Sequence, residues 1–174
     1  MKLVLPDMTY KDRAIEYINE FYTYGSQING SGSLDRFLRE STYEQWLTKL
    51  RGDMDLANLP PSKVPALTYF FLREEDEKII GMVNIRLALN DFLSSWGGHI
   101  GYSVRPTERG RGCGTELLRQ ALQVCGRVGI KRVLVTCDKS NPASAGVIKN
   151  CGGVLENEIP QPDGEILQRY WIEL

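Results

Sequence analysis

A glycine-rich segment between a predicted strand and a predicted helix constrains the fold more than any other part of the chain. Residues 105–115 read Arg-Pro-Thr-Glu-Arg-Gly-Arg-Gly-Cys-Gly-Thr. Residues 100–104 before it have the pattern of a strand, and a helix from Thr115 carries apolar residues at helical spacing. Its apolar face is Leu118, Ala121, Leu122, Cys125 and Val128. The junction predicts an α/β chain in which a strand leads directly into an anion-binding helix terminus.

The spacing of the glycines indicates which kind of anion site this is. Glycines at 110, 112 and 114 remove side chains that would keep an anion from the backbone, while Arg109 and Arg111 add positive charge. The segment lacks the G-x-G-x-x-G of dinucleotide sites and the G-x-x-x-x-G-K of nucleoside-triphosphate loops. It fits the pattern Arg/Gln-x-x-Gly-x-Gly/Ala.

A second segment with the same strand-to-helix order follows. Residues 131–138 form a predicted buried strand, Asn141-Pro142-Ala143-Ser144 comes next, and a short helix ends at residues 151–153, Cys-Gly-Gly. Taken together, residues 99–153 resemble the GNAT superfamily of acyl-CoA-dependent N-acetyltransferases. The overall sequence, including residues 81–86 and 169–172, resembles a bacterial branch of that superfamily. The glycine pattern alone is weak, and it is the ordered combination that carries the resemblance.

The resemblance implies a fold and a co-substrate. The fold is an α/β (α+β) acyl-CoA N-acyltransferase fold: a mixed, mostly antiparallel central sheet of six or seven strands, splayed at the coenzyme site, with helices on both faces. The co-substrate is acetyl-CoA. In this family the glycine loop holds the pyrophosphate, the strand before it binds pantetheine through its backbone, and the second motif contacts the coenzyme from the other side. The corresponding residues here are Tyr102, Ser103, Val104, Arg109, Gly110, Arg111, Gly112, Cys113, Gly114, Thr115, Asn141 and Ser144.

The proton-transfer residues are less defined by the resemblance. Many family members have a tyrosine seven residues after the asparagine, where this chain has Ile148. Tyr102 or Tyr170 could replace it, or the thiolate could leave unassisted, because a thiol pKa of ~8.5 makes it a fair leaving group. Some members carry a catalytic glutamate early in the strand; this chain has Gly98 there and His99 beside it. His99 is the candidate general base, and a hydrogen-bonded structural histidine is the alternative.

The first half of the chain supplies the predicted acceptor side. A helix is expected from Thr9, which resembles the start of a capping box with Asp12, to near Gly25, and another from Thr42, where Gln45 completes a capping box. Strands are expected at residues 67–73 and 79–89. The segment 30–35 either walls the acceptor site, as the resemblance implies, or is a solvent loop. Asn84, Arg86, Asn90 and Asp91 either meet the acceptor or form an exposed strand end. Further strands are expected at residues 154–159 and 165–174.

Length and charge bound the class of protein. The 174 residues predict a single domain spanning residues 1–174, and a net charge of -1 argues against a nucleic-acid partner. No apolar run reaches the ~20 residues that a membrane span requires, so no membrane partner and a cytoplasmic location are expected. Four separated cysteines with one histidine favour reduced, packed thiols over a metal site. Cys113 is the exception, because a helix N-terminus among arginines favours its thiolate.

These observations together predict an N-acetyltransferase that moves acetyl from acetyl-CoA to a primary amine by direct attack in a ternary complex. The acceptor is a small-molecule or protein amine, and a homodimer is compatible with the sequence. A non-catalytic acyl-CoA-binding sensor is the alternative, and a loop serving a nucleotide is a second alternative.

Overall fold

The computed structural model describes residues 1–55, 57 and 59–174. Its strands form two antiparallel groups. β1 (Lys2–Val4), β2 (Ala66–Arg73), β3 (Lys78–Arg86) and β4 (Ile100–Val104) pair in that order. β5 (Arg132–Asp138), β6 (Val154–Pro160) and β7 (Ile166–Glu173) pair in the order β5-β7-β6. The prediction of a mostly antiparallel sheet with helices on both faces is confirmed.

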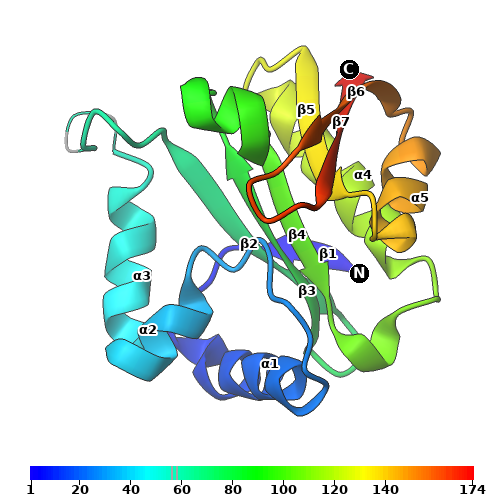
Figure 1. The fold of residues 1–174 in the computed structure, drawn as a ribbon. Helices are drawn as coiled ribbons and strands as arrows, with labels where there is room; N and C mark the ends of the chain where they lie inside the picture. The colour runs from blue at the N-terminus through cyan, green and yellow to red at the C-terminus, as the bar shows by residue number, and fades with distance from the viewer. Residues whose placement is uncertain (56, 58) are drawn as a thin grey trace.

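Helices cover both faces of the strands (Figure 1). On one face, α1 (Lys11–Thr23), α2 (Leu34–Glu40) and α3 (Tyr43–Gly52) pack on β2 and β3 through a core that includes Trp46 and Phe70. On the other, α4 (Cys113–Arg127) and α5 (Pro142–Asn150) pack through a core that includes Leu117 and Ile148. Short turns of helix lie at η1 (Met8–Tyr10), η2 (Leu93–Gly97) and η3 (Pro106–Glu108). In the part of the chain that the structure describes, no helix is both long and apolar enough to cross a bilayer.

The two strand groups meet at the start of β4 and then separate. The amide of His99, which directly precedes β4, donates to the carbonyl of Leu134 in β5 at 2.7 Å. Beyond this contact, among the described strands, β4 pairs with β3 alone and β5 with β7 alone. We call the gap between β4 and β5 the splay. It is the feature that the family resemblance implied for the coenzyme site.

Most predicted elements are present, with local corrections. Thr42 caps α3 by accepting the Gln45 amide at 3.2 Å, as the capping box predicted. The predicted cap at Thr9 is wrong: Asp7 accepts the Thr9 amide at 2.8 Å and caps η1, which leads into α1. Val128, predicted on the apolar face of α4, lies just past the helix end and is exposed. β1 and α2 were not predicted.

Candidate functional site

The segment 109–115 joins β4 to α4 through two glycines in the left-handed region, and we call it the phosphate loop after the role that the family resemblance implies. Gly110 has a φ of 74° and Gly112 a φ of 78°. Gly112 is the N-cap of α4, and among the residues that the structure describes no side chain caps the helix there. The first-turn amides therefore lack the side-chain acceptor that most helices provide, which leaves them available to an anion.

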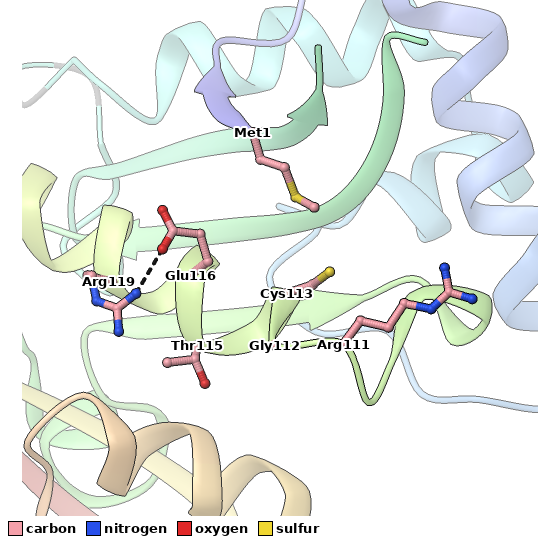
Figure 2. Close-up of a pocket in the computed structure, with 7 residues that line it drawn as sticks. All are labelled: Met1, Arg111, Gly112, Cys113, Thr115, Glu116 and Arg119. Atoms are coloured by element: carbon pink, nitrogen blue, oxygen red, sulfur yellow. Dashed lines mark hydrogen bonds and ion pairs between the residues drawn. The ribbon is translucent and has the colours of Figure 1, made fainter. Parts of the chain in front are cut away.

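A cavity of about 530 Å³ opens at this helix terminus (Figure 2). Met1, Gly112, Thr115 and Arg119 contribute to its lining. Arg119 pairs with Glu116 at 2.8 Å. The arginine therefore compensates the negative charge of Glu116 at the place where an anion would enter the cavity. Figure 2 shows the Arg111 side chain extending away from Thr115 and Arg119, and it pairs with Glu108 at 3.1 Å.

The loop is anchored to α1 by a buried arginine. Arg105 is 1% exposed, and its Nε donates to the Ile79 carbonyl at 2.9 Å. Its Nη1 donates to Glu16 at 2.8 Å and to Glu20 at 3.0 Å. Glu20 also accepts the Thr107 amide at 3.0 Å, and this contact lowers the pKa of Glu20 against the opposing effect of its burial. This network fixes where β4 ends and the phosphate loop begins.

Two residues of the loop differ from the sequence expectation. Arg109 turns back toward β4: its Nε donates to the Val104 carbonyl at 3.1 Å, and its guanidinium lies 5.5 Å from the ring centroid of Phe21. The expected Cys113 thiolate is wrong, because burial and the nearby Glu108 carboxylate raise the pKa of Cys113. Cys113 is a buried thiol that packs in the core.

Alternation along β4 decides which backbone groups face the splay. The Arg86 amide donates to His99 and the Arg105 amide donates to Ile80, each at 2.8 Å, so odd-numbered residues of this strand face β3. The backbone groups of Tyr102 and Val104 therefore face the splay. Those of Ser103 do not, and the Ser103 carbonyl also accepts the Tyr17 hydroxyl at 3.1 Å.

The second motif lies across the splay from β4. Asn141 caps α5 by accepting the Ser144 amide at 3.0 Å, which commits its side-chain oxygen and leaves its amide donor. The Ser144 hydroxyl lies 3.0 Å from the Tyr102 hydroxyl. Burial raises the pKa of Tyr102 to about 12, so its phenol is neutral at pH 7. Ile148, at the position of the family's tyrosine, is fully buried one turn after Ser144.

His99 lies at the closed end of the splay. Its Nδ1 accepts the Leu134 amide at 2.9 Å, which places the proton of the neutral imidazole on Nε2. Burial lowers the pKa of His99, and the nearby Arg86 charge lowers it further. In this tautomer neither nitrogen has a free lone pair. The assignment of His99 as general base stays a prediction, and this hydrogen bond counts against it.

A second cavity, of about 570 Å³, lies on the α1–α3 side of β4. The segment 28–33, α3 and the ends of β2 and β3 contribute to its lining. Gly30, with a φ of 71°, lies so close to β4 that a Cβ there would overlap the Gly101 carbonyl. The segment 30–35 is thus a cavity wall rather than a solvent loop. Of the four residues proposed near the strand end, Asn84, Arg86 and Asn90 line this cavity.

All four cysteines are free thiols. Burial raises the pKa of each, to about 11 for Cys125. Among the described residues, no group of three or more His, Cys, Asp or Glu side chains is arranged to hold a metal ion.

Comparison with known proteins defines the class of this protein. The model of the acetyltransferase (GNAT) family matches residues 32–152, a range that contains the phosphate loop, the splay and most of the second cavity. The chain therefore belongs to the GNAT acetyltransferase family, whose enzymes use acetyl-CoA as co-substrate. No curated protein matches the sequence significantly.

Solved structures share the fold at low sequence identity. A ribosomal-protein-S5-alanine acetyltransferase from Vibrio fischeri is 19% identical with a TM-score of 0.74, over 98% of this chain and 91% of that one. The microcin C7 self-immunity acetyltransferase, in complex with acetyl-CoA and AMP, is 21% identical with a TM-score of 0.66, over 99% and 91%. A variant of a spermidine N-acetyltransferase from Vibrio cholerae is 14% identical with a TM-score of 0.66, over 99% and 95%. Their acceptors differ, so the shared fold does not identify the acceptor of this chain.

Proposed function

We propose that the chain, as one domain over residues 1–174, transfers acetyl from acetyl-CoA to a primary amine by direct attack. The observation that carries this is that the segment after β4 opens into one cavity while β4 itself borders the wall of another. The first cavity opens at the uncapped terminus of α4 and suits the coenzyme phosphates, and Gly30, in the wall of the second cavity, lies against Gly101 of β4. An acyl group lying along the free edge of β4 would be reached from the second cavity.

The coenzyme would be held mainly by backbone. Phosphates would accept the first-turn amides of α4, with Gly112 allowing close approach and Arg119 adding charge. The backbone groups of Tyr102 and Val104 that face the splay would form hydrogen bonds with pantetheine. The side-chain amide of Asn141 would donate to pantetheine from the start of α5. Donors aimed at the thioester carbonyl would stabilise the oxyanion that forms when the amine attacks.

In the transfer, the amine nitrogen forms a bond to the acetyl carbon, the carbon–sulfur bond breaks, the amine loses a proton to water, and the thiolate gains one. The second cavity favours the neutral amine, because its lining has four basic side chains against the two carboxylates of Asp35 and Asp53. We assign Tyr102 as the hydrogen-bond donor to the leaving sulfur, since its phenol is neutral and lies against α5.

The thiols of the chain support direct attack over an acetyl-cysteine intermediate. A nucleophilic cysteine needs a lowered pKa, and burial raises the pKa of all four. Four free thiols also fit the reducing cytoplasm in which we place the protein. The bacterial sources of two of the structural neighbours agree with the bacterial assignment.

Release of free thiol from acetyl-CoA in the presence of a panel of amines tests the proposal. Initial velocities at varied concentrations of both substrates should give intersecting lines, as a ternary complex requires. Parallel lines would instead mean a covalent acetyl-enzyme. Acetyl-CoA that binds but is never consumed with any amine would favour the non-catalytic sensor, which the isoleucine at position 148 would then explain.

A further inference from the structure

An arginine without a carboxylate partner lies in the second cavity. Arg86, the last residue of β3, directs Nη1 to the carbonyl oxygens of Gly97 and Gly98 at 2.7 and 3.0 Å. Among the residues that the structure describes, no hydrogen bond engages its Nε or Nη2, and no carboxylate lies within salt-bridge distance. Burial lowers the pKa of Arg86, because desolvation disfavours the charged guanidinium.

The charged side chains that line the second cavity carry more positive than negative charge. Both carboxylates of its lining are engaged: Asp53 pairs with Lys49, and Asp35 accepts the Ser31 hydroxyl at 3.0 Å and lies 3.6 Å from Arg39. Lys63 lines the cavity without an acidic partner in the described part of the chain. A polycationic acceptor would therefore meet net repulsion here, whereas an anionic group would supply the missing partner.

The place of Arg86 relative to β4 fixes where that anion would lie. The Arg86 amide bonds the His99 carbonyl, and a Cβ on Gly101 would lie 3.6 Å from Arg86 Nη2. The guanidinium thus lies beside the first residues of β4, where the splay begins. In an α-amino acid the amine is two bonds from the carboxyl carbon, so a carboxylate on Arg86 would bring the amine to the edge of β4.

We infer that the acceptor is an amine bearing a carboxylate close to its amino group, held by Arg86 in the second cavity. This inference rests on the proposed acetyl transfer for its chemistry, but the carboxylate site is a binding site whether or not turnover occurs. The planar fork of the guanidinium matches a carboxylate through two parallel hydrogen bonds. Phe92, 66% exposed in the cavity lining, offers an apolar surface to the rest of such a molecule.

Matched pairs of amines test the inference in the unmodified protein. L-phenylalanine is compared with phenethylamine and L-lysine with cadaverine, alongside spermidine and a peptide with N-terminal alanine. The acid of each pair should have a kcat/KM about tenfold or more above that of its decarboxylated partner. A preference for the decarboxylated amines, for spermidine or for the peptide would overturn the inference while leaving acetyl transfer intact.

Variants at two residues that line the second cavity show whether the preference for the carboxylate-bearing amine depends on Arg86. Arg86→Gln should bring the ratio within each pair close to one, mainly through KM, while the Kd of acetyl-CoA stays near that of the unmodified protein. Loss of the hydrogen bonds to the Gly97 and Gly98 carbonyls should lower the Tm without preventing folding. Lys63→Gln removes a charge from the same cavity and should keep most of the preference. A preference that survives in folded Arg86→Gln would overturn the inference.

A binding measurement separates failure of the site from failure of the enzyme. L-phenylalanine and L-lysine are titrated calorimetrically into the complex with coenzyme A. If no amine is acetylated, binding of either acid that is lost in Arg86→Gln supports the site and refutes the proposed transfer. Absence of binding by either acid to the unmodified protein refutes the site.

Discussion

Gly112→Ala should weaken acetyl-CoA binding and destabilise the fold by two separable effects. Gly112 has a φ of 78°, and a Cβ there would meet no atom of the described residues within 4 Å. The stability cost therefore comes from the left-handed backbone alone, roughly 1–2 kcal/mol for an L-residue. In a chain of this length that corresponds to a fall in Tm of about 2–8 °C.

The binding cost comes from the space that the same Cβ fills. It would project at the uncapped terminus of α4, where the coenzyme phosphates are proposed to lie. A hydrogen bond to a charged group contributes about 1.5–3 kcal/mol, so displacing a phosphate from one amide should raise the Kd by about 10- to 150-fold. Isothermal titration calorimetry with acetyl-CoA measures this directly.

Gly129→Ala is the matched control. Gly129 has a φ of 88° and equally open surroundings, but it follows the other end of α4, which at 15 residues is roughly 22 Å long. It should show the same fall in Tm with an unchanged Kd. Equal loss of affinity in both variants, or an unchanged Kd in folded Gly112→Ala, would refute the assignment of the phosphate loop.

Three further changes probe the splay. Asn141→Asp keeps the oxygen that caps α5 and removes the amide donor, so stability should hold while the acetyl-CoA Kd rises about fivefold, the equivalent of one ~1 kcal/mol hydrogen bond; an unchanged Kd would leave Asn141 as a cap only. Tyr102→Phe should lower kcat roughly tenfold or more with little change in coenzyme Kd, whereas Ser144→Ala, which keeps the phenol, should not; equal effects would remove Tyr102 from the chemistry. His99→Ala should cost about 1–3 kcal/mol, because the buried Leu134 amide loses its acceptor. Because the pKa of His99 is lowered in the folded protein, the unfolded state binds more protons than the folded state. The stability that His99 contributes is therefore complete above its ordinary pKa of 6.5 and is lost as the pH falls toward its pKa in the folded protein. Urea unfolding from pH 5 to 8 should show this loss in the unmodified protein and not in the variant. A hundredfold fall in kcat in folded His99→Ala would instead make it the base.

Local patterns predicted the elements that depend on neighbouring residues. The strand-to-helix junction at the phosphate loop and the Thr42 cap are of this kind, because each is determined within a few residues of sequence. α2 was missed because its seven residues bury only Leu34, which leaves no apolar periodicity to detect. β1, with three residues, is a strand only because it pairs with β2 at residues 70–72.

Long-range contacts explain what the sequence did not predict about the site. Arg105 reaches Glu16 and Glu20, which are 89 and 85 residues away, and no spacing rule connects them. The Cys113 expectation failed because it considered the helix terminus and nearby arginines but not burial. Arg86 was recognised as a strand-end residue, yet its lack of an acidic partner is visible only after folding.

The separation of β4 from β5 has a consequence for the physical behaviour of the chain. At the splay, β4 and β5, which would be neighbours in a continuous sheet, belong to separate sheets, so the amides of Tyr102 and Val104 face the gap rather than a partner strand. Unpaired strand edges attract other extended chains. If pantetheine occupies this gap, the coenzyme acts as a missing strand, and we expect the amides of Tyr102 and Val104 to exchange with solvent far more slowly once it is bound. Coenzyme would then enter first, because it completes the wall against which the amine must be placed.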